Sequence, residues 1–154
     1  MATVTDLIDA LSGFNLKTEV IKIFQDESIE IIGLNQEQMM HGRRSDGQRI
    51  GKYETTPSGD MSEYAKEKFD MNSLAGKGNV DLKYDGDYQN AMKVKLTGMN
   101  IDIDSGDWKS DMLKRMYTQK IFGLTKDSWQ KFIDVILLDR FFVSLEMRTG
   151  LEPK

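Results

Sequence analysis

The sequence of 154 residues contains no cysteine and a single histidine. Without cysteine the chain forms no disulfide bond, and it has neither a thiolate metal ligand nor a cysteine nucleophile. The histidine, His41, is a poor metal site because it is alone and no cysteine is nearby, and nothing in the sequence specifies the positioned serine and acid of a catalytic triad. We therefore expect His41 to be an exposed residue or the C-cap of a helix.

Long apolar runs are also absent. No stretch of 18 or more apolar residues exists, which argues against a membrane-spanning helix. The first 12 residues carry Asp6 and Asp9 and no basic residue, so a signal peptide is not expected there. With 39% hydrophobic and 30% charged residues, the composition indicates one folded domain over residues 1–154.

Basic residues are too few to give the whole chain a positive field. The net charge is −4, which disfavours the broad basic surface of most nucleic-acid-binding domains. The exception lies within residues 42–53, where several cations accompany the single acid Asp46, namely Arg43, Arg44, Arg49 and Lys52. A basic segment on an acidic chain predicts a neighbour of opposite charge, either another protein or a second copy of the chain.

Apolar spacing predicts helices in the first 40 residues. Thr3 or Thr5 is a suitable N-cap for a short helix that ends at Gly13. A helical stripe then predicts one continuous helix over residues 16–40, even though Gly33 falls inside it.

The C-terminal third also has helical periodicity. One helix is predicted over residues 108–119, with Trp108, Met112 and Met116 on a single face. Thr125 is a good N-cap for a last helix that runs to about residue 148. The apolar face of this helix is wider than one small sheet can cover, and it includes Trp129, Phe132, Ile133, Ile136, Leu137, Phe141, Phe142 and Leu145. Such a face indicates either core alone or core together with a subunit interface.

Alternating residues in the middle of the chain predict a β-hairpin over about residues 90–104. Met92, Val94 and Leu96 alternate with lysines, and Ile101 and Ile103 alternate with aspartates. A strand near residues 80–82 is expected to join it, because an isolated hairpin is marginal in water. The predicted fold class is α+β: a small antiparallel sheet packed by a long N-terminal helix and a long C-terminal helix.

Residues 41–60 lack periodicity and are rich in glycine and other turn formers. We expect a long basic loop that is mobile or becomes ordered on assembly. It lacks the Gly-Lys-Ser/Thr ending of a phosphate-binding P-loop and does not follow a strand. A nucleic-acid-binding accessory protein that uses this loop is one alternative function.

Aspartates gather between residues 81 and 107: Asp81, Asp85, Asp87, Asp102, Asp104 and Asp107. The run 102–107 fails the calcium-loop pattern, since glycine is not at the sixth position and no glutamate is at the twelfth. We interpret these residues mainly as solvated surface. A divalent-metal-dependent enzyme, such as a nuclease that uses Asp85, Asp87, Asp102 and Asp104, is the weaker alternative. No catalytic residue, metal site or cofactor is assigned.

The order of short motifs resembles a family of phage tail-completion and head–tail neck proteins, of the type found in phages of Bacteroidetes. The similarity covers about residues 31–142. Its motifs are Leu34-Asn35-Gln36-Glu37-Gln38, Ser45-Asp46-Gly47-Gln48-Arg49-Ile50-Gly51-Lys52-Tyr53, Glu63-Tyr64-Ala65-Lys66, Val80-Asp81-Leu82, Gly86-Asp87-Tyr88, Met92-Lys93-Val94 and Ile121-Phe122-Gly123-Leu124-Thr125.

This resemblance implies a structural virion protein, not an enzyme. Such a protein forms a ring that joins the capsid portal to the tail, in the virion and in the host cytoplasm during assembly. Its partners would be further copies of itself and other neck, portal or tail proteins. No membrane is involved, and DNA would enter only by passing through the lumen.

A ring requires two different surfaces on each subunit. Charge asymmetry suggests that the basic loop of one copy meets the acidic patch at residues 102–107 of the next. The interface candidates are therefore Arg43, Arg44, Arg49, Lys52, Tyr53, Asp102, Asp104, Asp107, Phe141 and Phe142.

Overall fold

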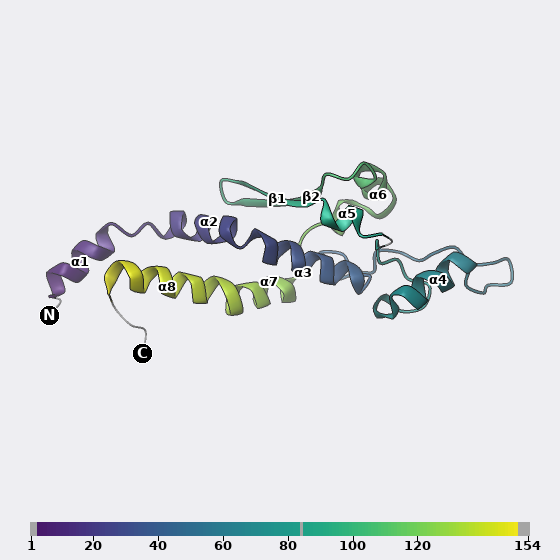
Figure 1. Ribbon diagram of the computed structural model, residues 1–154, viewed down its shortest axis with the longest axis horizontal. Coiled ribbons are helices and arrows are strands. Elements are labelled where there is room, and N and C mark those ends of the chain that lie inside the picture. Colours follow the sequence, from purple (N-terminus) through teal and green to yellow (C-terminus); the bar gives the residue numbers. More distant parts are fainter. Residues whose placement is uncertain (1–2, 84, 151–154) are drawn as a thin grey trace.

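A computed structural model describes residues 3–83 and 85–150, and it is elongated (Figure 1). Three N-terminal helices follow one another along the long axis: α1 (Val4–Ser12), α2 (Leu16–Asp26) and α3 (Ser28–Met40). The C-terminal segment returns beside them, so α7 packs against α3 while α8 packs against α2 and α1. We call the paired α1, α2 and α8 the arm of the molecule.

The C-terminal helix is continuous but not uniform. It consists of α7 (Lys126–Phe132), a π-helical turn η3 (Ile133–Leu137) and α8 (Leu138–Thr149). Thr125 caps α7, with its hydroxyl accepting from the Ser128 N–H at 3.2 Å. Thr3 caps α1 in a capping box with Asp6, and Gly13 ends it. The caps predicted from sequence are therefore confirmed.

The expectation of one helix over residues 16–40 is wrong in one respect. The chain is interrupted at Glu27, which ends α2 and begins α3, while Gly33 lies inside α3 without a break. The Glu27 carboxylate faces α8 and pairs with Arg140 at 2.7 Å. His41 is the exposed C-cap residue of α3, as predicted.

The α+β class and the hairpin are confirmed. Strands β1 (Met92–Thr97) and β2 (Asn100–Ser105) pair antiparallel, with Lys95 opposite Asp102 and Lys93 opposite Asp104. The third strand expected near residues 80–82 does not join this sheet, which has two strands in the described part of the chain. Instead the Val80 N–H donates to the Gly51 carbonyl at 3.0 Å, so that segment is paired with the basic loop.

The remaining elements lie beside the hairpin and toward the right-hand end of the molecule in Figure 1. They are α4 (Glu63–Met71), η1 (Ser73–Ala75), α5 (Asp87–Asn90), α6 (Ser110–Tyr117) and η2 (Gln119–Ile121). Ser62 caps α4, with its hydroxyl accepting from the Ala65 N–H at 3.2 Å. The helix predicted over residues 108–119 is present but shorter.

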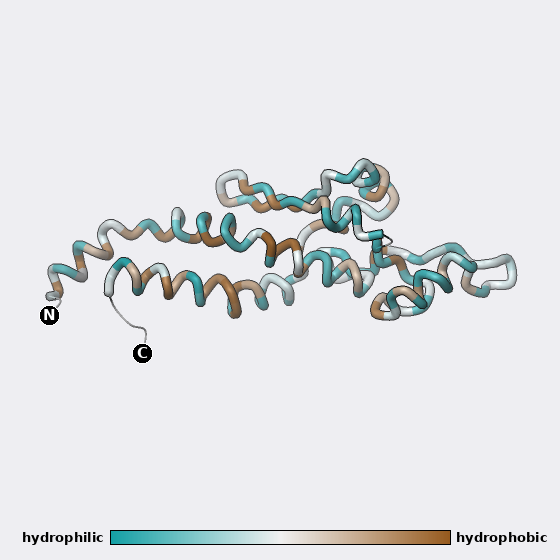
Figure 2. The backbone as a smooth tube through the Cα atoms, in the orientation of Figure 1, coloured by the Kyte–Doolittle hydropathy of each residue, from teal (hydrophilic) through white to brown (hydrophobic). Residues whose placement is uncertain are grey.

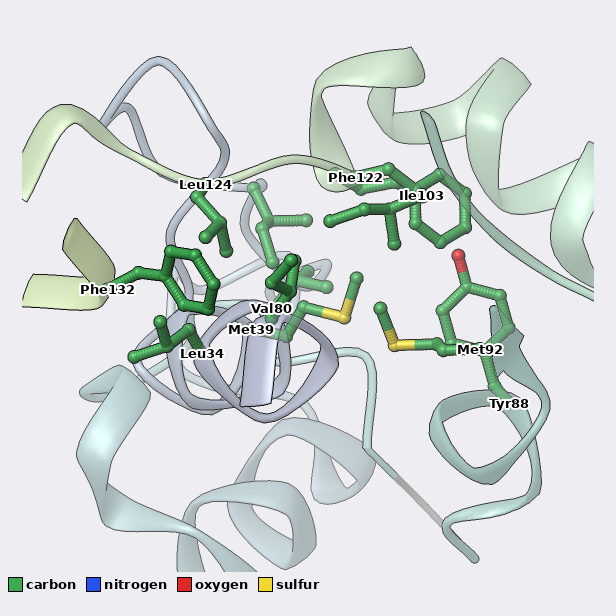
Figure 3. Close-up of a cluster of buried hydrophobic side chains, with 12 residues drawn as sticks. Leu34, Met39, Val80, Tyr88, Met92, Ile103, Phe122, Leu124 and Phe132 are labelled. Atoms are coloured by element: carbon green, nitrogen blue, oxygen red, sulfur yellow. The ribbon is translucent and has the colours of Figure 1, made fainter. Parts of the chain in front are cut away.

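The core lies where α3, the hairpin and the segment before α7 meet (Figure 3). Phe132, Ile31, Met39 and Ile121 are completely buried there. Burying each such side chain contributes about 1.5–3 kcal/mol. The core therefore lies in the middle part of the elongated molecule, with the arm extending to one side and α4 to the other (Figure 1).

Candidate functional site

The basic loop is folded onto its neighbours. The Ser45 N–H donates to the Lys120 carbonyl at 2.8 Å, and the Ile50 N–H donates to the Gly42 carbonyl at 2.9 Å. Gly123 permits this close approach, because it has φ +100° and an added Cβ would lie 3.1 Å from the Ser45 Cβ. Whether the loop is equally ordered before assembly stays a prediction.

Two of the loop arginines are already engaged within the chain. The Arg44 guanidinium donates to both carboxylate oxygens of Asp46, at 3.1 and 2.9 Å. The Arg49 guanidinium donates to the Ala75 carbonyl at 2.8 Å, which fastens the loop to η1. Arg43 is exposed and spans its own turn, donating to the Gly47 carbonyl at 3.2 Å.

The Asp46 carboxylate accepts hydrogen bonds from several groups of this turn and its neighbours. Desolvation raises its pKa, but the Gln48 N–H and the cations of Arg44 and Lys120 outweigh that effect and lower the pKa to about 2. The Lys120 ammonium lies 3.1 Å from the same carboxylate. The single carboxylate thus pairs with Arg44 and Lys120 and leaves the loop with an excess of positive charge.

Lys52 and Tyr53 leave the loop in different directions. Lys52 is exposed and bridges to Asn79 through the backbone. The Tyr53 ring packs edge-on against Tyr64, with centroids 5.2 Å apart, and its hydroxyl donates to Asp81 at 3.4 Å. Burial, together with the Asp81 charge, raises the pKa of Tyr53. The ring is therefore occupied and does not form a stacking platform for a nucleic-acid base.

The acidic patch is also partly neutralised within the chain. Asp104 accepts from the Ser105 N–H at 2.8 Å and the Ser110 hydroxyl at 2.9 Å, and it pairs with Lys114 at 3.2 Å. Desolvation raises the pKa of Asp104, but these donors lower it overall. Asp107 accepts from the Lys109 N–H at 2.8 Å, and Asp102 is exposed on the hairpin. The pairing of this patch with the basic loop stays a prediction.

The aspartates do not gather into a metal site within the described residues, where no three acidic or histidine side chains come close enough to share an ion. Asp85 lies 3.7 Å from Lys109, and Asp87 is exposed at the start of α5. The interpretation of Asp81 as solvated surface is wrong, because it is buried and pairs with the buried Lys68 at 2.8 Å. The metal-enzyme alternative needs convergence that these positions do not provide.

Exposed apolar side chains gather on the outer face of α8, among them Leu138, Phe142, Val143 and Met147. No residue of α8, which is described throughout, is buried, although half of them are apolar. Figure 2 shows hydrophobic positions recurring along this helix. Phe141 packs against the link between α1 and α2, with its ring 5.6 Å from that of Phe14 and edge-on to it, whereas Phe142 is exposed.

Polar contacts hold α8 to α2, and the sequence analysis missed them. Glu19 is buried, accepts from the Ser144 hydroxyl at 2.7 Å and pairs with Arg148. Glu27, at the junction of α2 and α3, pairs with Arg140 of α8. The only sequence signal was the charged residues that interrupt the apolar stripes of both helices. The arm is therefore joined by ion pairs as well as by apolar contacts such as that between Phe14 and Phe141.

Helix α6 carries a second apolar face in solvent. Met112 and Met116 lie in α6 and Trp108 lies two residues before it, and all three are exposed. The opposite side of α6 packs inward through Leu113 and Tyr117. The spacing predicted the stripe and could not tell which way it faces.

Comparison with protein-family models, with curated proteins and with solved structures gave no match to this chain. Within the described residues, no helix is both long enough and apolar enough to cross a bilayer.

Proposed function

We propose that this protein is a structural assembly subunit, and specifically a ring-forming component of a phage neck or tail-completion complex that joins the capsid portal to the tail. The assembly role rests on the surfaces described above. The phage setting rests on the order of sequence motifs that resembles the neck family.

The main support for the proposal is the exposed apolar surface of α8. A helix with this many apolar residues and no buried position has one side without an apolar neighbour. Exposed apolar patches of a few hundred Å² usually mark contacts with other proteins. The elongated shape supports the same proposal, since an arm that extends from the core can reach an adjacent subunit (Figure 1).

Native mass spectrometry of the purified protein, with negative-stain imaging of any large species, tests this function. We expect a discrete closed oligomer of about six or twelve copies, because heterologous contacts that close give cyclic rings. A protein that remains monomeric across the micromolar range, alone and with added divalent ions, contradicts self-assembly.

A further inference from the structure

A cavity of about 340 Å³ lies between α4, α6 and the segment that joins η1 to α5. Its walls are mainly aromatic and aliphatic, with four tyrosines, Tyr53, Tyr64, Tyr88 and Tyr117, brought together from four separate parts of the chain. Cavities of roughly 300–1,000 Å³ with apolar, aromatic walls and a few polar groups are the usual form of a small-molecule site. The cavity therefore has the size and the lining of a ligand site.

The aromatic walls are held in place by contacts within the chain. The Tyr53 and Tyr64 rings pack edge-on, with their centroids 5.2 Å apart. The Tyr117 ring lies against Gly51, where an added Cβ would lie 3.1 Å from a ring carbon. Rings that are already fixed lose little further conformational entropy when a ligand binds.

The backbone beside the cavity is strained. Leu82 lines the cavity and has φ +55°, in the left-handed region that leucine seldom adopts. The Asp81 carboxylate holds this turn, because it accepts from the Lys83 N–H at 3.1 Å. Residues kept in such conformations cluster at ligand sites and other functional positions. The strain is thus a second indication of a binding site, separate from the shape of the cavity.

Lysines outnumber carboxylates around the cavity. Lys68 and Lys109 line it, and each is paired within the chain, with Asp81 at 2.8 Å from the Lys68 ammonium and Asp85 at 3.7 Å from that of Lys109. Lys83 also lines the cavity and is exposed. Asp85 is the only acid among the described lining residues, so no third carboxylate there matches Lys83. The cavity therefore keeps a net positive charge.

The tyrosine hydroxyls add hydrogen-bond donors to this positive charge. Burial raises the pKa of Tyr53, Tyr88 and Tyr117, so these phenols keep their protons at neutral pH. Groups of aromatic rings can form cages for quaternary ammonium ions, but here the lysines repel a cation. Phenol and ammonium donors together favour a ligand with an acidic acceptor group.

We propose that this cavity binds a small organic anion, with a flat aromatic or apolar body and one carboxylate or similar acidic group. The tyrosine rings enclose the body, and Lys83, at the exposed side of the cavity, pairs with the acid. The cavity lies apart from the outer face of α8, which supports the proposed assembly function, so a failure of either proposal leaves the other standing.

Three naphthalene derivatives of nearly equal shape test the preference for an anion: naphthoate, the neutral naphthamide and the cation naphthylmethylamine. Each is titrated into the full-length protein, and its dissociation constant is measured by ligand-observed NMR, which works for any oligomeric state. We expect naphthoate to bind with a Kd of about 1 mM, as for a compound of this size at ordinary ligand efficiency. The amine should bind at least about fivefold more weakly, because it loses an ion pair at a partly exposed site.

Lys83→Gln tests the location of the site. We expect it to weaken naphthoate binding by about three- to fivefold, as for one partly exposed ion pair, and to leave naphthamide binding unchanged. Lys95→Gln is the matched control, since it removes the same charge from an exposed position on the hairpin and should leave the binding of both compounds unchanged. Both lysines are exposed, so both variants should fold as the unmodified protein does.

Three outcomes overturn the proposed anion site. Naphthoate fails to bind at about ten times the expected Kd, or it binds no better than the amine, or it binds equally well to the Lys83→Gln and Lys95→Gln variants.

Discussion

At the scale of single residues, the pairing of Lys68 with Asp81 is the most consequential contact in the core region. Their side chains are only 3% and 2% exposed, and their charged atoms are 2.8 Å apart. Asp81 also accepts from the Asn72 amide at 2.9 Å and the Lys83 N–H at 3.1 Å. Charges buried this deeply are tolerated only when their partners are complete.

Replacing Asp81 with asparagine therefore tests the pair. Asp81→Asn leaves the Lys68 ammonium without its buried counter-charge, so we expect the free energy of unfolding to fall by about 3–5 kcal/mol. Urea denaturation measures this loss. The matched control is Asp102→Asn on the exposed hairpin face, which should change stability by no more than about 0.5 kcal/mol. Equal effects of the two substitutions would show that Asp81 is solvated.

At the scale of elements, two amides on α3 hold the segment that leads into α7. The Asn35 amide donates to the Ile121 carbonyl at 3.2 Å, and its oxygen accepts from the Gly123 N–H at 3.1 Å. The Gln38 amide donates to the Gly123 carbonyl at 3.0 Å, and its oxygen accepts from the Thr125 N–H at 2.8 Å. Both side chains are buried, which explains polar residues inside an otherwise apolar stripe.

Removing one amide should loosen the junction between α3 and α7. Asn35→Leu keeps a similar volume but leaves a carbonyl and an N–H unpaired, at a cost of about 1–3 kcal/mol each. We expect a loss of about 2–6 kcal/mol in the free energy of unfolding, measured by chemical denaturation. Gln25→Leu, at an exposed position of α2, is the control and should be nearly neutral. A nearly neutral Asn35→Leu would mean that water replaces both bonds.

How much of the fold could be predicted depends on whether the signal is local. Thr3, Ser62 and Thr125 mark helix starts because a cap needs only its own turn. Hairpin register follows from alternation, which any one-residue shift would reverse. No proline or glycine lies beside Glu27, so local sequence does not predict the helix interruption there. The pairing of Val80 with Gly51 depends on a contact between segments about 30 residues apart, which local patterns do not encode.

The candidate site was predictable only in part, for the same reason. Charge composition located the basic loop, but the capture of Arg44 by Asp46 and of Arg49 by the Ala75 carbonyl depends on the folded turn. Spacing located the stripe of Trp108, Met112 and Met116 without its direction. Whether an apolar face meets the core or solvent is decided by the rest of the chain.

At the scale of the whole molecule, the arm extends from the core with an uncovered apolar face on α8 (Figure 1). Two charges placed on that face should prevent assembly. In the variant Leu138→Glu with Phe142→Glu, we expect the oligomer to be lost, because an interface cannot bury unpaired carboxylates. The monomer should lose at most about 1 kcal/mol of stability, since both positions are exposed.

Size-exclusion chromatography and native mass spectrometry measure the oligomer, and urea denaturation measures the monomer. Ile29→Glu, on an exposed apolar position of α3, is the matched control and should assemble normally. If the α8 variant assembles as well as this control, the outer face of α8 is not an interface.

The π-helical turn Ile133–Leu137 has a consequence for how the C-terminal helix is divided. A π turn takes up about one residue more than an α turn, so every later side chain is rotated by roughly 100° relative to an unbroken helix. Before the turn, Trp129 and Phe132 face Phe24.

Beyond the turn, Phe141, Ser144 and Arg148 face the N-terminal helices. Without the extra residue, Arg140, Val143 and Met147 would take those inward places, and the ion pair with Glu19 would be lost. The π turn thus rotates the inward face of the helix. Residues before the turn pack against the core, and residues after it contact the N-terminal helices of the arm.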